Sequence, residues 1–317
     1  MARVLITRRL PEGGLDPLLA AGHEVVPNDE DRPYATADLA AAAREVDAIV
    51  CLLTDRIDAE VLAAGAAGGR LRVVANVAVG YDNIDVATAT DLGIVVTNTP
   101  GVLTETTADT AFLLILAARR LASEAEADLR GGRWSGWALD DHLSLDVHGA
   151  MLGLVGFGRI GRAVARRAEG FGMEVLHHTR TDTGRPGWTA DLDELVARVD
   201  ILSLHVPLAP ATRHLIDRAR LGRMRPGATL VNTTRGPVVD EEALADALHA
   251  GHLHSAGLDV YEREPEVHPR LLAAPHTVLL PHIGSATVGT RTAMARLAAT
   301  NAAAVLAGGE PPNPVRV

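Results

Sequence analysis

A glycine-rich loop between two apolar runs carries the most specific chemical signal in this chain. Residues 152–155 are apolar, and Gly156, Gly158 and Gly161 follow at the spacing G-x-G-x-x-G before a helical run and a second apolar run. A strand, a turn with this spacing and a helix form the fingerprint of dinucleotide binding. The first glycine permits a tight turn, the second lets the backbone approach a pyrophosphate, and the third lets helix and strand pack closely. We therefore predict a dinucleotide site here, with a purely structural glycine turn as the alternative.

Three ionisable residues lie at or just beyond predicted strand ends later in the chain. Arg235 follows Asn-Thr-Thr, Glu264 lies in a turn before Pro265, and His282 follows Leu-Leu-Pro. Because open α/β sheets bind ligands beyond the carboxyl ends of their strands, all three are candidates for a reaction site. Taken singly, each also has a structural explanation: a salt bridge for Arg235, a solvated turn for Glu264 and a hydrogen-bonded strand end for His282.

The loop at residues 76–85 is a further candidate, because it follows a predicted strand and contains small residues. Backbone N–H groups in such a turn can bind a carboxylate. An ordinary strand-to-helix turn is the alternative, and the loop by itself favours that alternative.

Short aliphatic runs alternate with alanine-rich helical stretches through most of the chain. Because these runs are apolar throughout, they predict parallel strands in sheets that are covered on both faces. A turn cluster at 97–101 marks a boundary, and a long alanine-rich helix at 285–307 leaves the second sheet. The helix at 104–120 is apolar almost all round in its second half, so we expect it to be buried between domains or between subunits. The predicted strands flanking the glycine unit are 4–7, 24–26, 48–53, 72–75 and 94–97 before it, and 201–207, 229–234, 256–260 and 278–280 after it.

The composition excludes several classes of function. A chain of 317 residues can form two domains with their own cores, and its formal net charge of −10 leaves no basic stripe for a nucleic acid. We find no uncharged membrane-spanning run and no signal-peptide layout, and therefore expect a cytoplasmic protein with no membrane partner. All thirty basic residues are arginine, which excludes Schiff-base chemistry and the P-loop lysine. The single cysteine, Cys51, is predicted to be a buried strand residue.

Histidines give no metal site. His249, His252 and His254 are closely spaced, but Gly251 breaks their helix and no acid or cysteine completes a ligand set. The adjacent pair at 177–178 would face opposite sides of a strand.

Six segments resemble the motifs of the D-isomer-specific 2-hydroxyacid dehydrogenases, in the order and spacing of that family and over nearly the whole chain. They are 79–85, 97–109, 153–161, 231–240, 257–265 and 281–287. Within the family, the chain is most similar to the glyoxylate and hydroxypyruvate reductases. The resemblance implies an α/β protein of two domains. A doubly wound Rossmann cofactor domain, residues 99–285, would be inserted into a flavodoxin-like substrate domain, residues 1–98 plus 286–317, with the active site in the cleft between them.

The resemblance also assigns catalytic roles. His282 would be the acid/base that protonates the carbonyl oxygen as hydride arrives, which suits histidine because its ordinary pKa lies near neutrality. Glu264 would hydrogen-bond to that imidazole and favour its protonated form. Arg235 would bind the substrate carboxylate and keto oxygen, since a guanidinium keeps its charge and can bind two oxygens at once. Asp259 would contact the nicotinamide carboxamide.

The other residues that the resemblance implies fall into two groups. Backbone N–H groups at 77–80 would hold the substrate carboxylate, which reverses the interpretation of that loop as an ordinary turn. The substrate group is Leu53, Val77, Ala78, Val79 and Gly80, with Arg235 and His282. The cofactor group is Thr104, Gly156, Phe157, Gly158, Arg159, Ile160, Gly161, His178, Thr179, Arg180, Thr181, His205, Val206, Pro207, Thr212, Thr233, Thr234, Asp259 and Gly284.

The end of the second apolar run bears on the choice of dinucleotide. Fingerprints that prefer NAD place an acidic residue there to bind the ribose hydroxyls. The usual acidic position of the family falls on Thr179, and Arg180 follows it. Because Arg180 and its polar neighbours could bind a 2′-phosphate, we predict that NADP(H) is preferred and that NAD(H) is possible. Asp182 is the contrary observation, since it could bend back toward the ribose.

We therefore expect reduction of a small 2-keto acid, glyoxylate or hydroxypyruvate, to the D-2-hydroxy acid by NAD(P)H. The resemblance also implies a homodimer, with the 104–120 helix and the loop containing Trp134 and Trp137 near the partner and Trp137 reaching toward its site. Three alternatives stay open. The chain could act on another substrate, such as lactate, phosphoglycerate or a bulkier 2-keto acid, or it could be a dinucleotide-sensing protein like the corepressors related to this family. It could also be a structural relic that binds a cofactor without turnover.

Overall fold

The computed structural model describes residues 1–316 and divides into two compact units. Unit 1 comprises Met1–Leu103 and Ala286–Val317, and unit 2 comprises Thr104–Ser285. The first division falls after Leu103, later than the boundary at residue 98 that the sequence predicts. Residues 98 and 99 stay with unit 1 because the N–H of Asn98 donates to the carbonyl of Asn313 and the N–H of Thr99 donates to the carbonyl of Ala78.

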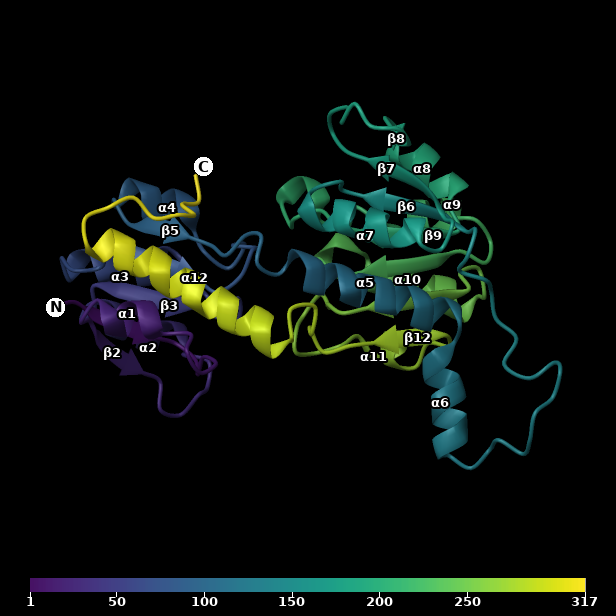
Figure 1. The fold of residues 1–317 in the computed structure, drawn as a ribbon, viewed down its shortest axis with the longest axis horizontal. Helices are drawn as coiled ribbons and strands as arrows, with labels where there is room; N and C mark the ends of the chain where they lie inside the picture. The colour runs from purple at the N-terminus through teal and green to yellow at the C-terminus, as the bar shows by residue number, and fades with distance from the viewer. Residues whose placement is uncertain (317) are drawn as a thin grey trace. The chain divides into compact units, whose positions relative to one another are not determined.

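Unit 1 is built on a parallel five-stranded sheet with the order β2-β1-β3-β4-β5, which is the flavodoxin-like order. Strands β3 and β4 are buried at every residue, and this burial on both faces explains why they are apolar except for Asn76. Helix α12 packs on α1 and β4 (Figure 1). Helices α2 and α3 pack together, and their buried side chains belong to a hydrophobic core that also includes strand residues of the sheet. The strands are β1 (Arg3–Ile6), β2 (Glu24–Pro27), β3 (Ala48–Cys51), β4 (Val73–Asn76) and β5 (Val95–Thr97). The helices are α1 (Asp16–Ala20), α2 (Thr36–Ala43), α3 (Ala59–Ala67), α4 (Val86–Asp91) and α12 (Val288–Leu306).

Unit 2 is built on a parallel seven-stranded sheet with the order β12-β11-β10-β9-β6-β7-β8. Counted from β6, this is the doubly wound Rossmann order, and the connections change direction between β6 and β9. The strands are β6 (Met151–Val155), β7 (Glu174–His178), β8 (Trp188–Thr189), β9 (Ile201–Leu204), β10 (Thr229–Asn232), β11 (Ser255–Leu258) and β12 (Thr277–Leu279). The helices are α5 (Thr104–Arg119), α6 (Ala122–Arg130), α7 (Arg159–Glu169), α8 (Leu192–Arg198), α9 (Arg218–Arg223), α10 (Glu241–His249) and α11 (Pro269–Leu272), with short 3-10 turns at Pro210–Thr212 and Gly236–Val238.

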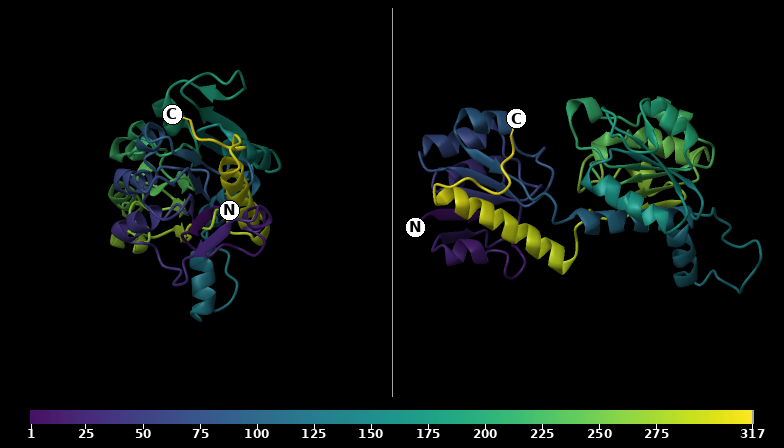
Figure 2. Two further views of the ribbon diagram at one scale, coloured as in Figure 1. Left: turned by 90° about the vertical axis from the view of Figure 1, so that its left-hand side faces the viewer. Right: turned by 45° about the horizontal axis from the view of Figure 1, so that its top comes forward.

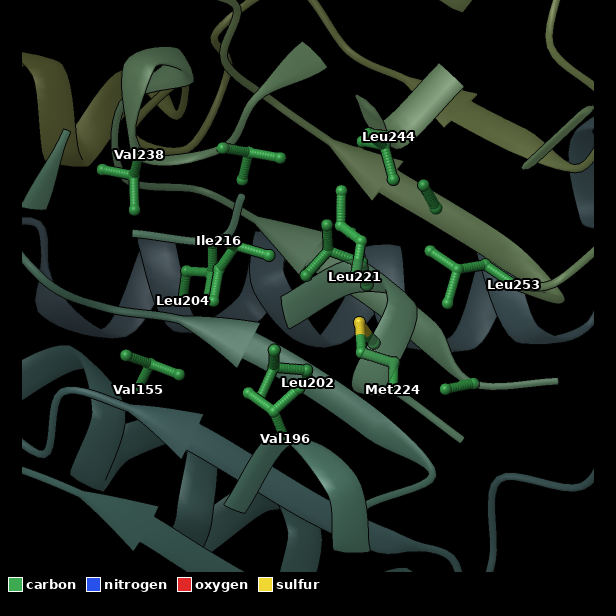
Figure 3. Packing of buried hydrophobic residues seen from close by; sticks show 14 of the residues in the cluster. Val155, Val196, Leu202, Leu204, Ile216, Leu221, Met224, Val238, Leu244 and Leu253 are labelled. Carbon is green, nitrogen blue, oxygen red and sulfur yellow. The ribbon is translucent and has the colours of Figure 1, made fainter. Parts of the chain in front are cut away.

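Two hydrophobic layers fix the unit 2 sheet. On one face, Leu202 and Leu204 of β9 pack with Leu221 of α9 and Leu244 of α10 (Figure 3). On the other face, α5 and α7 cover the sheet, and α5 lies so close to β11 that a Cβ at Gly257 would lie 2.9 Å from the Cβ of Leu114. This close packing accounts for much of the predicted burial of the 104–120 helix within unit 2 alone.

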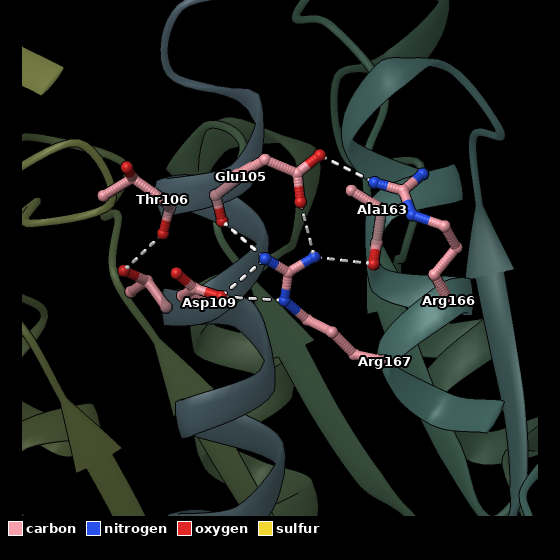
Figure 4. A network of polar contacts seen from close by, with 7 residues as sticks. Glu105, Thr106, Asp109, Ala163, Arg166 and Arg167 are labelled. Carbon is pink, nitrogen blue, oxygen red and sulfur yellow. Dashed lines mark hydrogen bonds and ion pairs between the residues drawn. The ribbon is translucent and has the colours of Figure 1, made fainter. Parts of the chain in front are cut away.

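A charged network joins the first two turns of α5 to α7 (Figure 4). The guanidinium of Arg167 donates to the carboxylate of Asp109 at 2.6 Å, to that of Glu105 at 3.0 Å and to the carbonyl of Ala163 at 2.8 Å. Arg166 adds a second ion pair to Glu105. A guanidinium shared between two carboxylates and a carbonyl has one favoured orientation, so the network fixes α7 against α5.

Side chains cap the first turns of several helices. Asp58, Asp85, Asp240 and Thr287 each accept a hydrogen bond from a backbone N–H of the helix that follows. Such a cap satisfies a donor that the helix cannot pair itself, and it is worth about 1 kcal/mol. Helix α7 is different, because its N-cap is Gly158 and no side chain caps it.

Helix α6 and the loop that follows it extend from the rest of unit 2 (Figures 1 and 2). No residue of α6 is buried, and the side chains of Trp137 and Leu139 are 82% and 80% exposed. Sequence inspection did not predict α6 or the two-residue strand β8, because neither has a clear apolar pattern. Within residues 1–316, no helix is both long enough and apolar enough to cross a membrane.

Candidate active site

The glycine loop after β6 has the geometry that its spacing predicts. Gly156 has a positive φ of 95°, and a Cβ there would lie 2.6 Å from the carbonyl oxygen of His205. A Cβ at Gly161 would lie 2.4 Å from the carbonyl oxygen of Gly156. At Gly158, in contrast, a Cβ would meet nothing within 4 Å. The first and third glycines therefore serve the turn and the packing, whereas the second leaves open space over the backbone.

The start of α7 offers unpaired donors beside this open space. The N–H of Arg162 donates to the carbonyl of Gly158 at 3.1 Å, but those of Arg159, Ile160 and Gly161 have no acceptor among residues 1–316. The positive end of the helix dipole lies at the same place. Unpaired N–H groups, open space and an uncapped helix fit the pyrophosphate of a dinucleotide.

Phe157 and Thr233, both predicted to bind the cofactor, differ in whether their side chains already have a partner in the protein. The ring of Phe157 stacks on His177 with centroids 3.8 Å apart, so this side chain packs against β7. The hydroxyl of Thr233, just after β10, is buried and has no hydrogen-bond partner in the part of the chain that the structure describes. An orphaned hydroxyl at a strand end is available to a ligand.

In the segment after β7, the guanidinium of Arg180 has no partner within residues 1–316, whereas the carboxylate of Asp182 is hydrogen-bonded. The hydroxyl of Thr179 donates to the carbonyl of Thr181 at 2.7 Å, and Nδ1 of His178 lies 3.0 Å from the carbonyl oxygen of Thr189. Asp182 accepts a hydrogen bond from the N–H of Gly184 at 2.8 Å, so its carboxylate closes the turn. Arg180 is exposed, and its guanidinium makes no hydrogen bond or ion pair within residues 1–316.

The loop after β9 is fixed by its own hydrogen bonds. The N–H of His205 donates to the carbonyl of Val155 at 2.7 Å, which anchors this loop beside β6. The hydroxyl of Thr212 donates to the carbonyl of Pro207 at 2.7 Å and accepts from the N–H of Ala209 at 2.8 Å. Val206 lies between these anchors and packs against the core.

His205 is held in its neutral form. Its Nε2 lies 3.0 Å from the hydroxyl of Ser203, and its Nδ1 is buried without a partner among the described residues. Burial lowers the pKa of His205 to about 4, because the protonated ring would lose its hydration. This imidazole therefore carries no charge at neutral pH.

Arg235 is positioned by the residues just before it. The side chain of Asn232 accepts from both the N–H and the hydroxyl of Thr234, and it donates to the carbonyl of Arg235 at 2.9 Å. The next residue, Gly236, lies so close to Tyr261 that a Cβ would sit 1.8 Å from the backbone carbon there. Only glycine allows this approach, which brings the Arg235 turn beside the segment that carries Glu264.

Glu264 and His282 form a hydrogen-bonded pair. Oε2 of Glu264 lies 2.8 Å from Nδ1 of His282, while Oε1 accepts from the N–H of Tyr261 at 3.0 Å. Burial raises the pKa of Glu264, but the hydrogen bond and charge of His282 outweigh that effect, and the charge of Arg235 acts in the same direction. The net effect is a lowered pKa, so Glu264 is ionised at neutral pH and faces the imidazole as a carboxylate.

Asp259 holds the turn that carries His282. Its two carboxylate oxygens accept from the N–H groups of Ile283 at 2.7 Å and Gly284 at 2.8 Å, and its carbonyl accepts from the N–H of His282 at 2.9 Å. His282 has a positive φ of 53°, a conformation that costs a non-glycine residue energy and that these bonds sustain. Burial raises the pKa of Asp259, although the two N–H groups oppose that effect.

The predicted substrate loop in unit 1 turns its carbonyls into the protein. The carbonyls of Ala78, Val79 and Gly80 accept from Thr99 N–H at 2.9 Å, Asn98 Nδ2 at 2.8 Å and Asn76 Nδ2 at 2.8 Å. No acceptor within residues 1–316 pairs with the N–H groups of these three residues. Val77 differs, because its N–H donates to the carbonyl of Cys51. The free N–H groups therefore span 78–80, and Leu53 is half-buried in the loop after β3.

Unit 2 thus brings together Arg235, Glu264, His282 and Asp259, and Thr104 is the first residue of α5. The rings of His249, His252 and His254 do not converge, since each lies within hydrogen-bond distance of a different backbone carbonyl, those of Arg270, Leu221 and Arg119. Inspection of the sequence did not assign Asn232 or the turn-holding contacts of Asp259. The signal for both was a lone polar residue that ends, or directly follows, an otherwise apolar strand.

Comparisons with known proteins agree with this geometry. Residues 112–284 match the profile described as the NAD-binding domain of the D-isomer specific 2-hydroxyacid dehydrogenases. The chain is 46% identical to the glyoxylate reductase of Thermococcus onnurineus, covering 98% of this chain and 94% of that protein. It is 47% identical to the glyoxylate reductase of Korarchaeum cryptofilum, covering 98% and 95%.

Solved structures show the same similarity. The NADPH-dependent glyoxylate/hydroxypyruvate reductase of Sinorhizobium meliloti, in complex with NADP and malonate, superposes with a TM-score of 0.88 at 39% identity, covering 99% of this chain and 96% of that chain. A protein of Thermus thermophilus superposes with a TM-score of 0.92 at 46% identity, covering 99% and 100%. The order of strands, the glycine loop and these matches lead to one conclusion: the chain belongs to the D-isomer specific 2-hydroxyacid dehydrogenases.

Proposed function

We propose that the protein reduces a small 2-keto acid, glyoxylate or hydroxypyruvate, to the D-2-hydroxy acid with NADPH. The observation that carries this proposal is the pair of His282 and Glu264, 2.8 Å apart in the unit that also holds the open glycine loop. Relatives that carry the name glyoxylate reductase support the choice of substrate.

The proposed chemistry is one hydride and one proton added across a carbonyl. A bound dinucleotide would supply the hydride to C2 of the keto acid, leaving the carbonyl electron pair on oxygen. His282 donates a proton from Nε2 to that oxygen, because its Nδ1 already faces Glu264. The ionised Glu264 favours the protonated imidazole before the transfer and accepts its Nδ1–H throughout. Bulk solvent then restores the proton.

Charges and N–H groups would hold the carboxylate of the substrate. We propose that the guanidinium of Arg235 binds carboxylate and keto oxygens, because it presents two parallel donors. The free N–H groups of Ala78, Val79 and Gly80 are the proposed donors in unit 1. These donors favour a compact, anionic substrate over a neutral one.

The first turn of α7 and the segment after β7 would hold the dinucleotide. The unpaired N–H groups of residues 159–161 are the proposed pyrophosphate donors. The unpaired Arg180 is the proposed partner of a 2′-phosphate, and Asp182 is occupied by its own turn. NADP(H) is therefore the proposed preference, with NAD(H) as a slower substitute.

We also propose a homodimer that covers the exposed side chains of the α6 extension. Trp137, Leu139 and Leu143 are 82%, 80% and 70% exposed, which is costly for three large apolar residues in one loop. A measured mass of one protomer by sedimentation would overturn this part of the proposal.

The reaction itself is tested by following nicotinamide absorbance with purified protein. NADPH and NADH are each mixed with glyoxylate, hydroxypyruvate, pyruvate or phosphohydroxypyruvate. We expect rapid oxidation of NADPH with the first two acids. If all four acids leave the absorbance unchanged while the protein still binds NADPH, the proposed substrate is wrong.

A further inference from the structure

Two loops of unit 1 leave adjacent strands side by side. Strands β3 and β4 are parallel, with Cys51 opposite Asn76 at their carboxyl ends. The loop after β3 carries Leu53, and the loop after β4 carries residues 77–80. The N–H of Val77 donates to the carbonyl of Cys51 at 2.8 Å, which is the last backbone bond between the two segments before they become irregular.

The carboxamide of Asn83 joins these loops beyond the strands. Its Nδ2 donates to the carbonyls of Leu52 at 3.1 Å and Asp55 at 3.0 Å, both in the loop after β3. Its Oδ1 accepts from Nδ2 of Asn76 at 3.1 Å. One side chain therefore uses both of its donors and its acceptor to connect the two loops, and the half-buried position of Asn83 limits the water that could replace these bonds.

Asn76 passes this connection on to the 78–80 segment. The same Nδ2 that donates to Asn83 also donates to the carbonyl of Gly80 at 2.8 Å. Asn76 is fully buried, and its Oδ1 faces the thiol of Cys51 at 3.6 Å. A peptide group that accepts through its carbonyl has its plane fixed, so this bond orients the peptide that follows Gly80 and limits the rotation of those before it.

The far side of the β3 loop is held as firmly. Asp55 is 3% exposed, and its Oδ2 accepts from the hydroxyl of Thr7 at 2.5 Å and from the N–H of Leu52 at 2.8 Å. The backbone of Ile57 makes two hydrogen bonds to the segment that carries Asn83. Its N–H donates to the carbonyl of Asn83, and its carbonyl accepts from the N–H of Asp85. Asn83 is thus tied to a rigid support.

We propose that Asn83 is a positioning residue, which holds the loop after β4 on the loop after β3 so that the free N–H groups of residues 78–80 converge on the carboxylate of the substrate. This inference rests on the proposed function for the identity of the carboxylate. The structural part, the fixed loop, does not depend on it.

A carboxamide is the side chain that this position needs. Aspartate has the same shape, but one of its oxygens would replace the Nδ2 donor. That oxygen would face the carbonyls of Leu52 and Asp55 without a hydrogen to share. Alanine would leave the carbonyl of Asp55 and one N–H of Asn76 without this partner, and the carbonyl of Leu52 would keep only the N–H of Asp55. Either change loosens the loop without touching the residues proposed for proton or hydride transfer.

The test compares Asn83→Ala and Asn83→Ser with a matched control, Asn28→Ala. Asn28 is also a half-buried asparagine of unit 1, and its Nδ2 also donates to two backbone carbonyls, those of Thr7 at 2.8 Å and Arg32 at 2.6 Å. Neither of these bonds reaches the loops after β3 and β4. The full-length enzyme is assayed with glyoxylate and NADPH, and amide hydrogen exchange of residues 77–83 is measured without any ligand.

We expect both Asn83 variants to raise the KM for glyoxylate about tenfold, with kcat and the KM for NADPH within about twofold, because carboxylate binding is lost and proton transfer is not. Exchange at 77–83 should become faster in these variants and stay unchanged in Asn28→Ala. An unchanged KM for glyoxylate in a folded Asn83→Ser protein overturns the proposal.

The exchange measurement separates this inference from the proposed function. If the wild-type protein reduces no keto acid, the proposed substrate is wrong, yet faster exchange in the Asn83 variants alone would still support the positioning of the loop. If exchange at 77–83 is the same in wild type and variants, Asn83 does not position the loop, whatever the substrate is.

Discussion

The imidazole of His282 and the carboxylate of Glu264 are hydrogen-bonded to each other, and each residue makes a second hydrogen bond that involves the backbone. Glu264 accepts from the N–H of Tyr261 through the oxygen that does not face the ring, and the N–H of His282 donates to the carbonyl of Asp259. The 2.8 Å contact between Nδ1 and Oε2 is therefore set by the backbone of two strand ends. Nε2 is the nitrogen that this arrangement leaves for a substrate.

Replacing Glu264 with glutamine should shift the pH profile of reduction. Without the negative charge the protonated imidazole is less favoured, so the alkaline limb of the kcat/KM profile should move to lower pH, with a loss on the order of tenfold at pH 8. Glu262→Gln is the control, because Glu262 pairs with His214 instead, at 3.1 Å. Superimposable profiles for Glu264→Gln and wild type would exclude the proposed role of this carboxylate.

The carboxylate of Asp259 should matter for both stability and turnover. At present both carboxylate oxygens of Asp259 accept hydrogen bonds from backbone N–H groups. Asp259→Asn would place a side-chain N–H against one of those two backbone N–H groups. We expect a loss of about 1–3 kcal/mol in the free energy of unfolding, measured by urea denaturation. We also expect a lower kcat, since the strained turn at His282 loses its support. Asp217→Ala, which removes only the cap of α9, should lower stability and leave kcat unchanged; a kcat equal to wild type in Asp259→Asn would refute the coupling.

Arg180→Ala should separate the two dinucleotides. Loss of a charge-assisted hydrogen bond to a 2′-phosphate should raise the KM for NADPH roughly 10- to 100-fold and that for NADH by less than about twofold. Arg9→Ala removes the same charge from an exposed side chain in unit 1 and should change neither. Equal increases for NADPH and NADH in Arg180→Ala would contradict the assignment of the phosphate.

His205 makes the folded state sensitive to mild acid. Its pKa is about 4 in the folded chain, and an unfolded histidine has a pKa of about 6.5. Between these values the unfolded state binds more protons, so stability falls as pH drops from about 6.5 to about 4. Between pH 7 and pH 5, the Tm of His205→Gln should therefore fall by less than the Tm of wild type. The control His148→Gln, at a side chain that is 78% exposed, should match wild type. An equal fall in Tm for all three proteins would show that His205 does not supply this sensitivity.

The sequence was sufficient for the parts of the fold that depend on local pattern. Unbroken apolar runs predicted the parallel strands, and the glycine spacing predicted the turn at Gly156 and the close packing at Gly161. The extension after Arg119 was not foreseen, because α6 is largely polar and none of its residues is buried. The boundary that the sequence predicts after residue 98 differs from the division after Leu103, because the turn at 98–99 bonds back to residues 78 and 313, a long-range relationship that no local pattern reveals.

The sequence predicted some features of the candidate site and missed others, again because long-range contacts are not visible in local patterns. The motifs around Arg235, Glu264 and His282 identified these residues, and the resemblance implied the hydrogen bond between the last two, which the structure shows at 2.8 Å. The connecting role of Asn83 and the turn-holding role of Asp259 depend on where side-chain atoms meet across 20 or more residues, since Asn83 bonds to Leu52 and Asp259 to Gly284. Such contacts follow from the register of neighbouring strands, which the sequence does not state.

The most direct test of the account is the rate of NADPH oxidation with glyoxylate by His282→Gln, measured beside the dissociation constant for NADPH. If His282 supplies the proton, kcat should fall at least about 100-fold while NADPH binds within about twofold of wild type, because glutamine keeps a hydrogen-bonding side chain but cannot deliver the proton. Turnover near the wild-type rate in a variant that binds NADPH normally would contradict the central role of the His282–Glu264 pair.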